Sequence, residues 1–343
     1  VVVHRLHSPH FLSPPWWKAL GALSLCDAPA MEQKAIQALI AWRFCADPGD
    51  QVANTLVGLE GIVGALEWVR SKDSIIAMAK RLAAHLDDGH RLDTQLRAFR
   101  TRDDPARVET SWAVQQRLPI TMVAPGDAAW PEGLDDLGPY APLGLWLRGN
   151  PELLVDASPT LAVVGSRAAT AQGLANTKAI VEGPWCEDVA IISGGARGID
   201  TAAHRSALDH QRPSLAVLAG GLESVYPSEN THLMANVAKT GVVISESPCT
   251  TAPRGELFLH RNRLIAALCE AVVVVEARFR SGALNTASHA SALGRSVAVV
   301  PGRWGDKQTA GCFRLVRERG AIVLSEPADI AMLLSPRLRD GPG

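Results

Sequence analysis

The sequence predicts an α/β protein: a doubly wound, mainly parallel Rossmann-like sheet preceded by a small helical N-terminal domain. Three observations support this prediction. The second half of the chain alternates short apolar segments of strand length with segments of helical periodicity. These apolar segments are continuous rather than alternating, as in strands buried on both faces. The first half holds seven of the nine tryptophans and amphipathic stretches of helix length.

The helical N-terminal domain is expected over residues 1–115. Amphipathic stretches at 74–86 and 92–99 carry the helical pattern. Whether residues 1–30 are folded stays open. With 343 residues, 47% of them apolar and 20% charged, the chain is long enough for a second domain with a substantial core.

The Rossmann-like domain is expected over residues 116–335, followed by a tail at 336–343. Two lead-in strands, 119–123 and 143–147, precede the main sheet. The predicted strands of the main sheet are 161–164, 189–192, 215–218, 242–244, 271–275, 297–300 and 322–324. The predicted helices between them are 174–182, 201–208, 232–239, 263–268 and 286–293.

The loops that follow these strands are the expected functional site, because ligands of doubly wound sheets bind at the carboxyl ends of the strands. Glycine lets backbone N–H groups approach an anion, and a helix start adds a positive dipole end. Arginines beside two of the turns suit phosphate oxygens. The residues concerned are Gly165, Ser166, Arg167, Gly194, Gly195, Arg197 and Gly198. The alternative is that these glycines only permit tight strand-to-helix turns.

Several catalytic and cofactor classes lack their motifs. There is no G-x-G-x-x-G after the first strand, no G-x-x-x-x-G-K-[ST] and no G-x-S-x-G, so neither nicotinamide binding, P-loop hydrolysis nor serine esterase chemistry is supported. No cofactor is expected. The six cysteines form no C-x-x-C, and His4, His7 and His10 lie in a Pro-containing segment expected to be solvated. No metal site is assigned.

Acidic and histidine side chains at the strand ends could assemble a general acid and base. Asp200 and His204 lie one helical turn apart, and Glu246 and Glu276 follow strands. A structural interpretation is favoured, in which Asp200 is a helix N-cap and His204 a packing partner. No catalytic residue is therefore assigned.

Charge is distributed unevenly along a chain whose formal net charge is −1. Between Arg254 and Arg319 there are eleven cations and five acids, and Phe258 and Trp304 are available for base stacking. Phe258 is expected in a loop over 253–259. This segment favours a groove for single-stranded nucleic acid, with an arginine-rich solvated surface as the alternative. No apolar run approaches membrane-spanning length and no signal-peptide core is seen, so a cytoplasmic protein is expected.

Seven ordered motifs extend across the second half of the chain. They are Val164–Arg167, Ser193–His204, Ala216–Leu222 with Tyr226, Pro227 and Asn230, Ser245-Glu246, Arg261–Ala266, Val275–Ala277 and Ser281–Leu284. Together they resemble the DprA/Smf family of DNA-processing proteins over about residues 119–325.

The resemblance implies a non-enzymatic, dimeric protein that binds single-stranded DNA, protects incoming DNA and loads the RecA recombinase during natural transformation. It implies that Arg167 and its turn hold phosphates, that Phe258 stacks a base, and that Arg261 and Arg263 border the same pocket. The further DNA-contacting residues that it suggests are Arg254, Asn262, Ser281 and Gly282.

Three positions depart from the family pattern: Leu259, Asn285 and Phe313. An alternative function is that of a nucleotide-binding hydrolase resembling the lysine-decarboxylase-like phosphoribohydrolases. The P-G-G-x-G-T signature of those enzymes is absent, and 301–305 is only superficially similar. A third possibility is an adaptor whose helical domain is the functional part.

Overall fold

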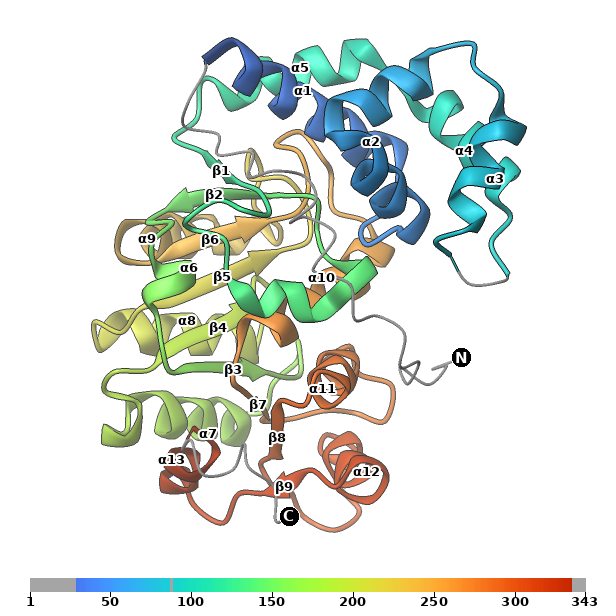
Figure 1. Cartoon of the computed structure of the whole chain (residues 1–343). Helices are drawn as coiled ribbons and strands as arrows, with labels where there is room; N and C mark the ends of the chain where they lie inside the picture. The colour runs from blue at the N-terminus through green and yellow to red at the C-terminus, as the bar shows by residue number, and fades with distance from the viewer. Residues whose placement is uncertain (1–28, 87–88, 335–343) are drawn as a thin grey trace.

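The protein folds around one mixed nine-stranded sheet with helices on both faces (Figure 1). The computed structural model describes residues 29–86 and 89–334. This architecture confirms the predicted fold class. The expectations for residues 1–28, which include the run of three histidines, and for the tail at 336–343 lie outside the described residues.

The strands follow the order β1-β2-β6-β5-β4-β3-β7-β8-β9 across the sheet. β1 and β2 pair antiparallel, β2 joins β6 antiparallel, and all other pairs are parallel. Each of the seven predicted main-sheet strands is present. The strand bounds are β1 (Thr121–Val123), β2 (Leu145–Gly149), β3 (Thr160–Val164), β4 (Ala190–Gly194), β5 (Ser214–Leu218), β6 (Val242–Ser245), β7 (Ala271–Val274), β8 (Ser296–Val299) and β9 (Ile322–Val323).

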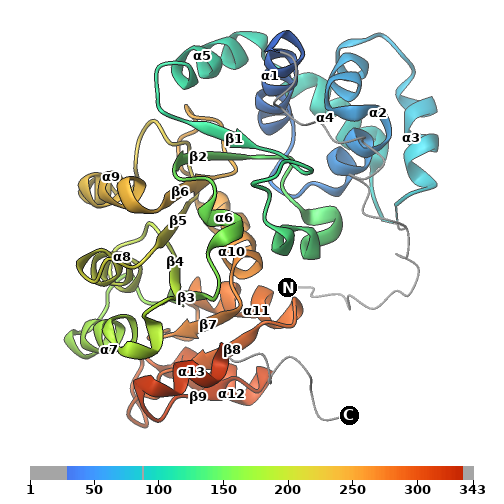
Figure 2. The same cartoon turned by 60° about the vertical axis from the view of Figure 1, so that its left-hand side comes forward.

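Helices cover both faces of the parallel part, as the continuous apolar strands predict (Figure 2). One face is covered by α7 (Ala171–Glu182), α8 (Ile199–Asp209) and α9 (Thr231–Thr240). The other face is covered by α10 (Gly255–Leu268), α11 (Ala283–Ala292) and α12 (Ala310–Arg319). Successive residues of one strand serve different faces, since Val163 shares a core with Ile180 of α7 and Ala162 shares one with Leu264 of α10.

In the described part of the chain, five N-terminal helices form a cluster beside the β1–β2 end of the sheet (Figure 1). They are α1 (Pro29–Cys45), α2 (Gln51–Arg70), α3 (Ile75–Ala83), α4 (Leu92–Arg102) and α5 (Pro105–Gln115). Of these, α3 lies on the outer side of the cluster, away from the strands (Figure 1). Trp42 of α1, Trp146 of β2 and Val243 of β6 belong to one buried cluster. The helical segment ends at Gln115 and shares its core with the sheet.

Short segments complete the chain between the main elements. They are the α-helical turns α6 (Leu153–Asp156) and α13 (Ile330–Leu333) and the 3₁₀ segments η2 (Glu132–Tyr140), η3 (Pro184–Cys186), η4 (Ser228–Asn230) and η5 (Pro327–Asp329). The connection between the two lead-in strands contains η2.

Helix α2 is long and apolar enough to cross a membrane by length and composition, although polar residues interrupt its apolar runs. Its packing explains that composition. Leu56 and Trp68 are in the shared core, and Asn54 donates hydrogen bonds to the carbonyl oxygens of Pro139 (2.8 Å) and Ala141 (2.9 Å). A positive φ of 72° at Gly61 interrupts the helix. α2 is a core helix of this fold.

Candidate functional site

The turns after β3 and β4 meet at the carboxyl edge of the sheet. Gly198 has a φ of 77°, and a Cβ there would lie 2.2 Å from the carbonyl oxygen of Ser166. That oxygen accepts a hydrogen bond from the backbone N–H of Ile199 at 3.2 Å. Gly198 is therefore required both by its own backbone conformation and by the close approach of the two turns. The contact brings the turns of Arg167 and Arg197 together, as the fold predicts.

Arg167 lies exposed over an aromatic pair. Its guanidinium carbon is 5.0 Å from the centroid of the Phe258 ring. The Phe258 ring in turn packs edge to face with Tyr226, with ring centroids 5.8 Å apart. Such cation–π and edge-to-face contacts hold the three side chains in a defined arrangement while leaving ring surface accessible.

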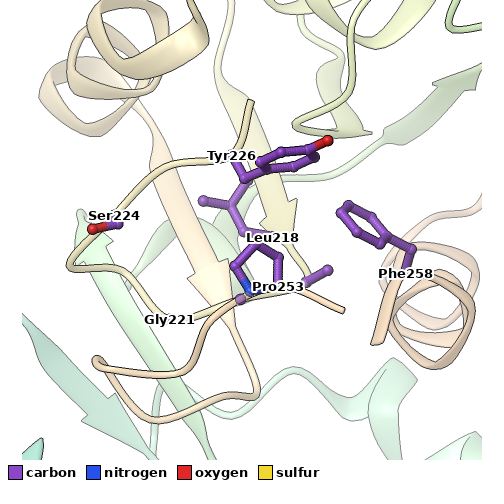
Figure 3. A pocket seen from close by; sticks show the side chains of 8 residues that line it. Leu218, Gly221, Ser224, Tyr226, Pro253 and Phe258 are labelled. Atoms are coloured by element: carbon purple, nitrogen blue, oxygen red, sulfur yellow. The ribbon is translucent and has the colours of Figure 1, made fainter. Parts of the chain in front are cut away.

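A small pocket opens beside these rings, where the loops after β5 and β6 approach each other (Figure 3). Gly220 and Gly221 form one side, and a Cβ at Gly221 would lie 2.1 Å from the carbonyl oxygen of Cys249. The complete lining is Leu218, Ala219, Gly220, Gly221, Ser224, Tyr226, Pro253 and Phe258. The pocket therefore joins an apolar floor to an aromatic rim.

Phe258 lies in the first turn of α10, so its predicted placement in a loop was wrong. The helix begins at Gly255 rather than Arg263. The glycine at position 255 argued against a helix start there, because glycine disfavours helix interiors. The missed signal is the i, i+7, i+8 spacing of buried Leu257, Leu264 and Ile265, which is typical of one helix face. The Phe258 side chain is partly exposed and belongs to none of the three hydrophobic cores of the described residues.

Arg261 is buried beneath the strand-end turns. Its Nη1 donates to the carbonyl oxygen of Val217. A Cβ on Gly194 would lie 2.5 Å from both this Nη1 and an Asp200 Oδ2, so the glycine leaves room for the two charged groups. Burial lowers the pKa of Arg261 to about 10, opposed by the Asp200 charge. Gly194 thus serves internal packing.

Arg263 points to the opposite side of α10, because residues two apart on a helix are separated by about 200°. It donates two hydrogen bonds to Glu246, at 2.7 and 2.9 Å, and a third to the carbonyl oxygen of Tyr140 at 2.9 Å. Arg43 of α1 donates to the Glu246 carbonyl oxygen at 3.0 Å. The resemblance implies that Arg261 and Arg263 border the pocket of Arg167, but both guanidinium groups are buried and hydrogen-bonded within the fold.

Asn262 connects α10 to the loop before α11. Its Nδ2 donates to the carbonyl oxygen of Gly282 at 3.2 Å and to Asn285 Oδ1 at 3.1 Å. The departure at Asn285 therefore supplies a polar partner for Asn262. Ser281 Oγ accepts from the backbone N–H of Ala283 at 3.3 Å, and Gly282 is exposed.

The N-terminus of α7, the expected anion site of the first turn, is filled by a side chain of the protein itself. The Glu276 carboxylate accepts from the Thr170 backbone N–H at 3.0 Å and from the Thr170 hydroxyl. A Cβ on Gly173 would lie 2.4 Å from the Glu276 carboxyl carbon. Glycine in the first turn of this helix therefore admits a carboxylate from the end of β7. No local sequence pattern indicates this pairing, because Thr170 and Glu276 are 106 residues apart.

Asp200 and His204 are both buried, and both form hydrogen bonds inside the fold. Gly198, not Asp200, is the N-cap of α8; the Asp200 carboxylate instead accepts from the backbone N–H of Ala196 at 3.3 Å. Burial raises the pKa of Asp200 to about 6. His204 lies between Ser214 Oγ and the Gly194 carbonyl oxygen, each at 2.8 Å, and burial lowers its pKa to about 4. The predicted packing role of His204 is confirmed.

The remaining predicted cations are exposed. Arg197 pairs with Glu229, and Arg254 precedes α10. Gly195 lies against Leu218, whose Cδ2 would be 2.5 Å from an added Cβ.

Within residues 29–86 and 89–334, no group of three or more His, Cys, Asp or Glu side chains could hold a metal ion.

Solved structures with this fold include DNA-processing proteins. The X-ray structure of DNA processing protein A from Streptococcus pneumoniae superposes with a TM-score of 0.69 and 29% identity, covering 86% of this chain and 96% of that one. A structure describing the single-stranded DNA binding mode of DNA processing protein A from Helicobacter pylori gives 0.57 and 25% identity, over 63% of this chain and 95% of the other.

Sequence comparison also finds DNA-processing proteins among the relatives of this chain. A DprA relative from Mycobacterium tuberculosis (strain ATCC 25618 / H37Rv) is 47% identical over 191 residues, which are 56% of this chain and 49% of the relative. The DprA protein of S. pneumoniae (strain ATCC BAA-255 / R6) is 40% identical over 199 residues, 56% of this chain and 70% of that protein. The match thus spans about half the length of the mycobacterial relative. The family model for DNA recombination-mediator protein A matches residues 121–335. The chain belongs to the DNA recombination-mediator protein A family, also known as DprA/Smf.

Proposed function

We propose that this protein binds single-stranded DNA, without catalysing a reaction on it, at the surface formed by Arg167, Tyr226 and Phe258. In the cell it would protect incoming DNA and load the RecA recombinase during natural transformation, acting as a cytoplasmic homodimer. The family membership and the single-stranded DNA binding described for the H. pylori relative support this proposal.

The observation that carries the proposal is the guanidinium of Arg167 over the Phe258 ring at 5.0 Å. A base that stacks on this ring places its phosphate beside a fixed cation, which is the combination that proteins use for single strands. Tyr226, about half exposed, extends the aromatic surface beyond Phe258. Duplex DNA would fit poorly, because its bases are already stacked on one another.

The nucleotide-hydrolase alternative is disfavoured by Glu276 and by the buried acid and base candidates. A nucleotide phosphate at the start of α7 would compete with the Glu276 carboxylate for the backbone N–H of Thr170. His204 has both ring nitrogens in hydrogen bonds within the core. Asp200 faces Arg261 and Gly194 rather than the pocket. These groups are hydrogen-bonded or packed inside the fold, and we assign no reaction to them.

Binding to a panel of ligands tests the proposal. Fluorescence anisotropy of the full chain would be measured with labelled single-stranded DNA, with the same sequence as a duplex, and with nucleotides. We expect single-stranded DNA to bind most tightly, and its affinity to fall with rising salt as counterions are released. Tighter binding of a nucleotide, or its hydrolysis, would overturn the proposal in favour of the enzyme. DNA binding without single-strand preference would also contradict it.

A further inference from the structure

A second pair of exposed aromatic side chains lies on the same edge of the sheet. Phe279 follows β7 and is about half exposed; Trp304 follows β8 and is fully exposed. β3, which leads to Arg167, neighbours β7, and β7 neighbours β8, all three parallel. Neighbouring strands are about 4.8 Å apart, so strand β8 is only about 10 Å from strand β3. Arg167, which lies over the Phe258 ring, therefore follows a strand next to the one that precedes Phe279 on the same sheet edge.

The Phe279 ring repeats the arrangement seen at Phe258. The guanidinium carbon of Arg314 lies 4.9 Å from the Phe279 ring centroid, close to the 5.0 Å between Arg167 and Phe258. Each ring therefore has a cation over it and remains partly open to solvent. The same pairing of a cation with an accessible ring thus occurs at two places on one sheet edge.

Trp304 is held outward by a tight turn. The backbone N–H of Asp306 donates to the carbonyl oxygen of Arg303 at 3.1 Å, and Gly305 has a φ of 81°. A positive φ at the third position is what a type II turn requires, and Trp304 then occupies the second position at the corner. Tryptophan is usually largely buried, so its full exposure at an ordered corner points to a ligand.

The loops that carry these aromatics are cationic. Segments 277–282 and 301–308 together contain four cations and one acid, Asp306, whose carboxylate accepts from the backbone N–H of Gln308 at 2.8 Å. The cations are Arg278, Arg280, Arg303 and Lys307. Arg278 bridges the two loops by donating to the Gln308 side chain at 2.8 Å. The charge of this surface complements a polyanion.

The first loop is also fixed to the helix that carries Phe258. Asn262 of α10 donates to the carbonyl oxygen of Gly282, and Phe258 lies one helical turn before it. The positions of Phe258 and Phe279 are therefore linked by one short hydrogen-bonded route.

We propose that Phe279 and Trp304, with the cations of their loops, form a second stacking surface that binds the continuation of the same single-stranded DNA. This inference rests on the proposed function and extends it along the sheet edge. It predicts that long strands gain affinity from Trp304, whereas strands that fill only the Arg167 and Phe258 site do not.

The test compares two lengths of oligothymidylate, about 5 and about 16 nucleotides, within the range of site sizes for single-strand binders. The full-length protein and Trp304→Ala, Trp304→Phe and Ile76→Ala variants would be titrated by anisotropy. Ile76 is the matched control because it is an exposed apolar residue on α3. We expect Trp304→Ala to lose about 5- to 150-fold in affinity for the long strand only, the equivalent of one stacked base. Trp304→Phe should retain most of the affinity and Ile76→Ala all of it.

Unchanged long-strand affinity in Trp304→Ala would overturn this inference. So would a smaller sedimenting species in that variant, because it would show that Trp304 holds a second copy of the chain instead. The outcomes also separate the two proposals. If the wild-type protein binds neither length, both fail. If the short strand binds through Phe258 while Trp304 has no effect, only the second surface fails.

Discussion

The buried middle of α10 and its exposed start differ in the role of their arginines. The sequence motifs suggested that these arginines all lie at one DNA-binding site. At the buried base, Arg261 and Arg263 contact carbonyl oxygens and face the carboxylates of Asp200 and Glu246. At the exposed start, Phe258 meets Arg167 from the turn after β3. Buried ion pairs impose geometry because their groups cannot be left unpaired, whereas exposed cations remain available to a ligand. Arg261 and Arg263 therefore fix the position of α10, and Arg167 and Phe258 remain available to a ligand.

The largest expected effect separates these regions through stability. Arg263→Ala should lower the free energy of unfolding by about 3 to 5 kcal/mol, because it leaves the buried Glu246 carboxylate without its hydrogen-bonded cation. Urea denaturation followed by circular dichroism measures the change. Arg254→Ala, at an exposed position before the same helix, should stay within about 0.5 kcal/mol. A cost below about 1 kcal/mol for Arg263→Ala would contradict the structural assignment.

A pH series sharpens the description of the buried region. The pKa of Asp200 is raised to about 6 from its ordinary value of 3.8, so its protonated form stabilises the fold and this contribution is lost as pH rises through 6. The pKa of His204 is lowered from 6.5 to about 4, which makes its contribution grow over the same range. The two effects oppose each other in the wild-type protein.

Asp200→Asn removes one of these opposing effects. Between pH 4 and 6, its stability should rise relative to wild type by at most about 3 kcal/mol. Thermal unfolding at several pH values, with Asp209→Asn at an exposed position of α8 as control, measures the difference. Parallel curves for wild type and Asp200→Asn would show that Asp200 does not titrate in this range.

At the exposed region, Arg167→Ala should weaken single-stranded DNA binding by about 10- to 100-fold, because a charge-assisted phosphate contact contributes about 1.5 to 3 kcal/mol. The slope of log K against log salt should become shallower by about 0.7. Anisotropy titrations at several salt concentrations measure both. Arg205→Ala, an exposed arginine on α8, is the matched control. Equal losses of DNA affinity in Arg167→Ala and Arg205→Ala would show that Arg167 does not belong to the binding site.

The smallest effect concerns Arg197, whose charge is partly neutralised by Glu229. Glu229→Gln should raise affinity for single-stranded DNA by no more than about 5-fold, since exposed ion pairs of this kind are weak and screened by solvent. The same titration measures the gain. Weaker binding after this substitution would mean that Glu229 positions Arg197 for DNA rather than competing with it.

Strand positions were predictable because continuous apolar runs between glycine-rich turns have few alternatives to buried parallel strands. The fate of individual charged residues was not. Whether Arg261 is buried depends on Gly194 and Asp200, which are more than sixty positions away in sequence. Likewise, Glu276 reaches Thr170 only because β7 lies beside β3. The local sequence pattern identified the sheet edge that carries the candidate site. Contacts between residues far apart in the sequence decided which side chains remain exposed at that edge.

The most direct test of the account is Phe258→Ala, measured for DNA affinity and for stability in the same preparation. If Phe258 stacks a base, affinity for a strand of about 5 nucleotides should fall by about 5- to 150-fold. The free energy of unfolding should change by no more than about 2.5 kcal/mol, the combined contribution of its contacts with Tyr226 and Arg167. A loss of about 3 to 5 kcal/mol in stability with DNA affinity intact would instead show that Phe258 packs the interior, and would contradict the proposed site.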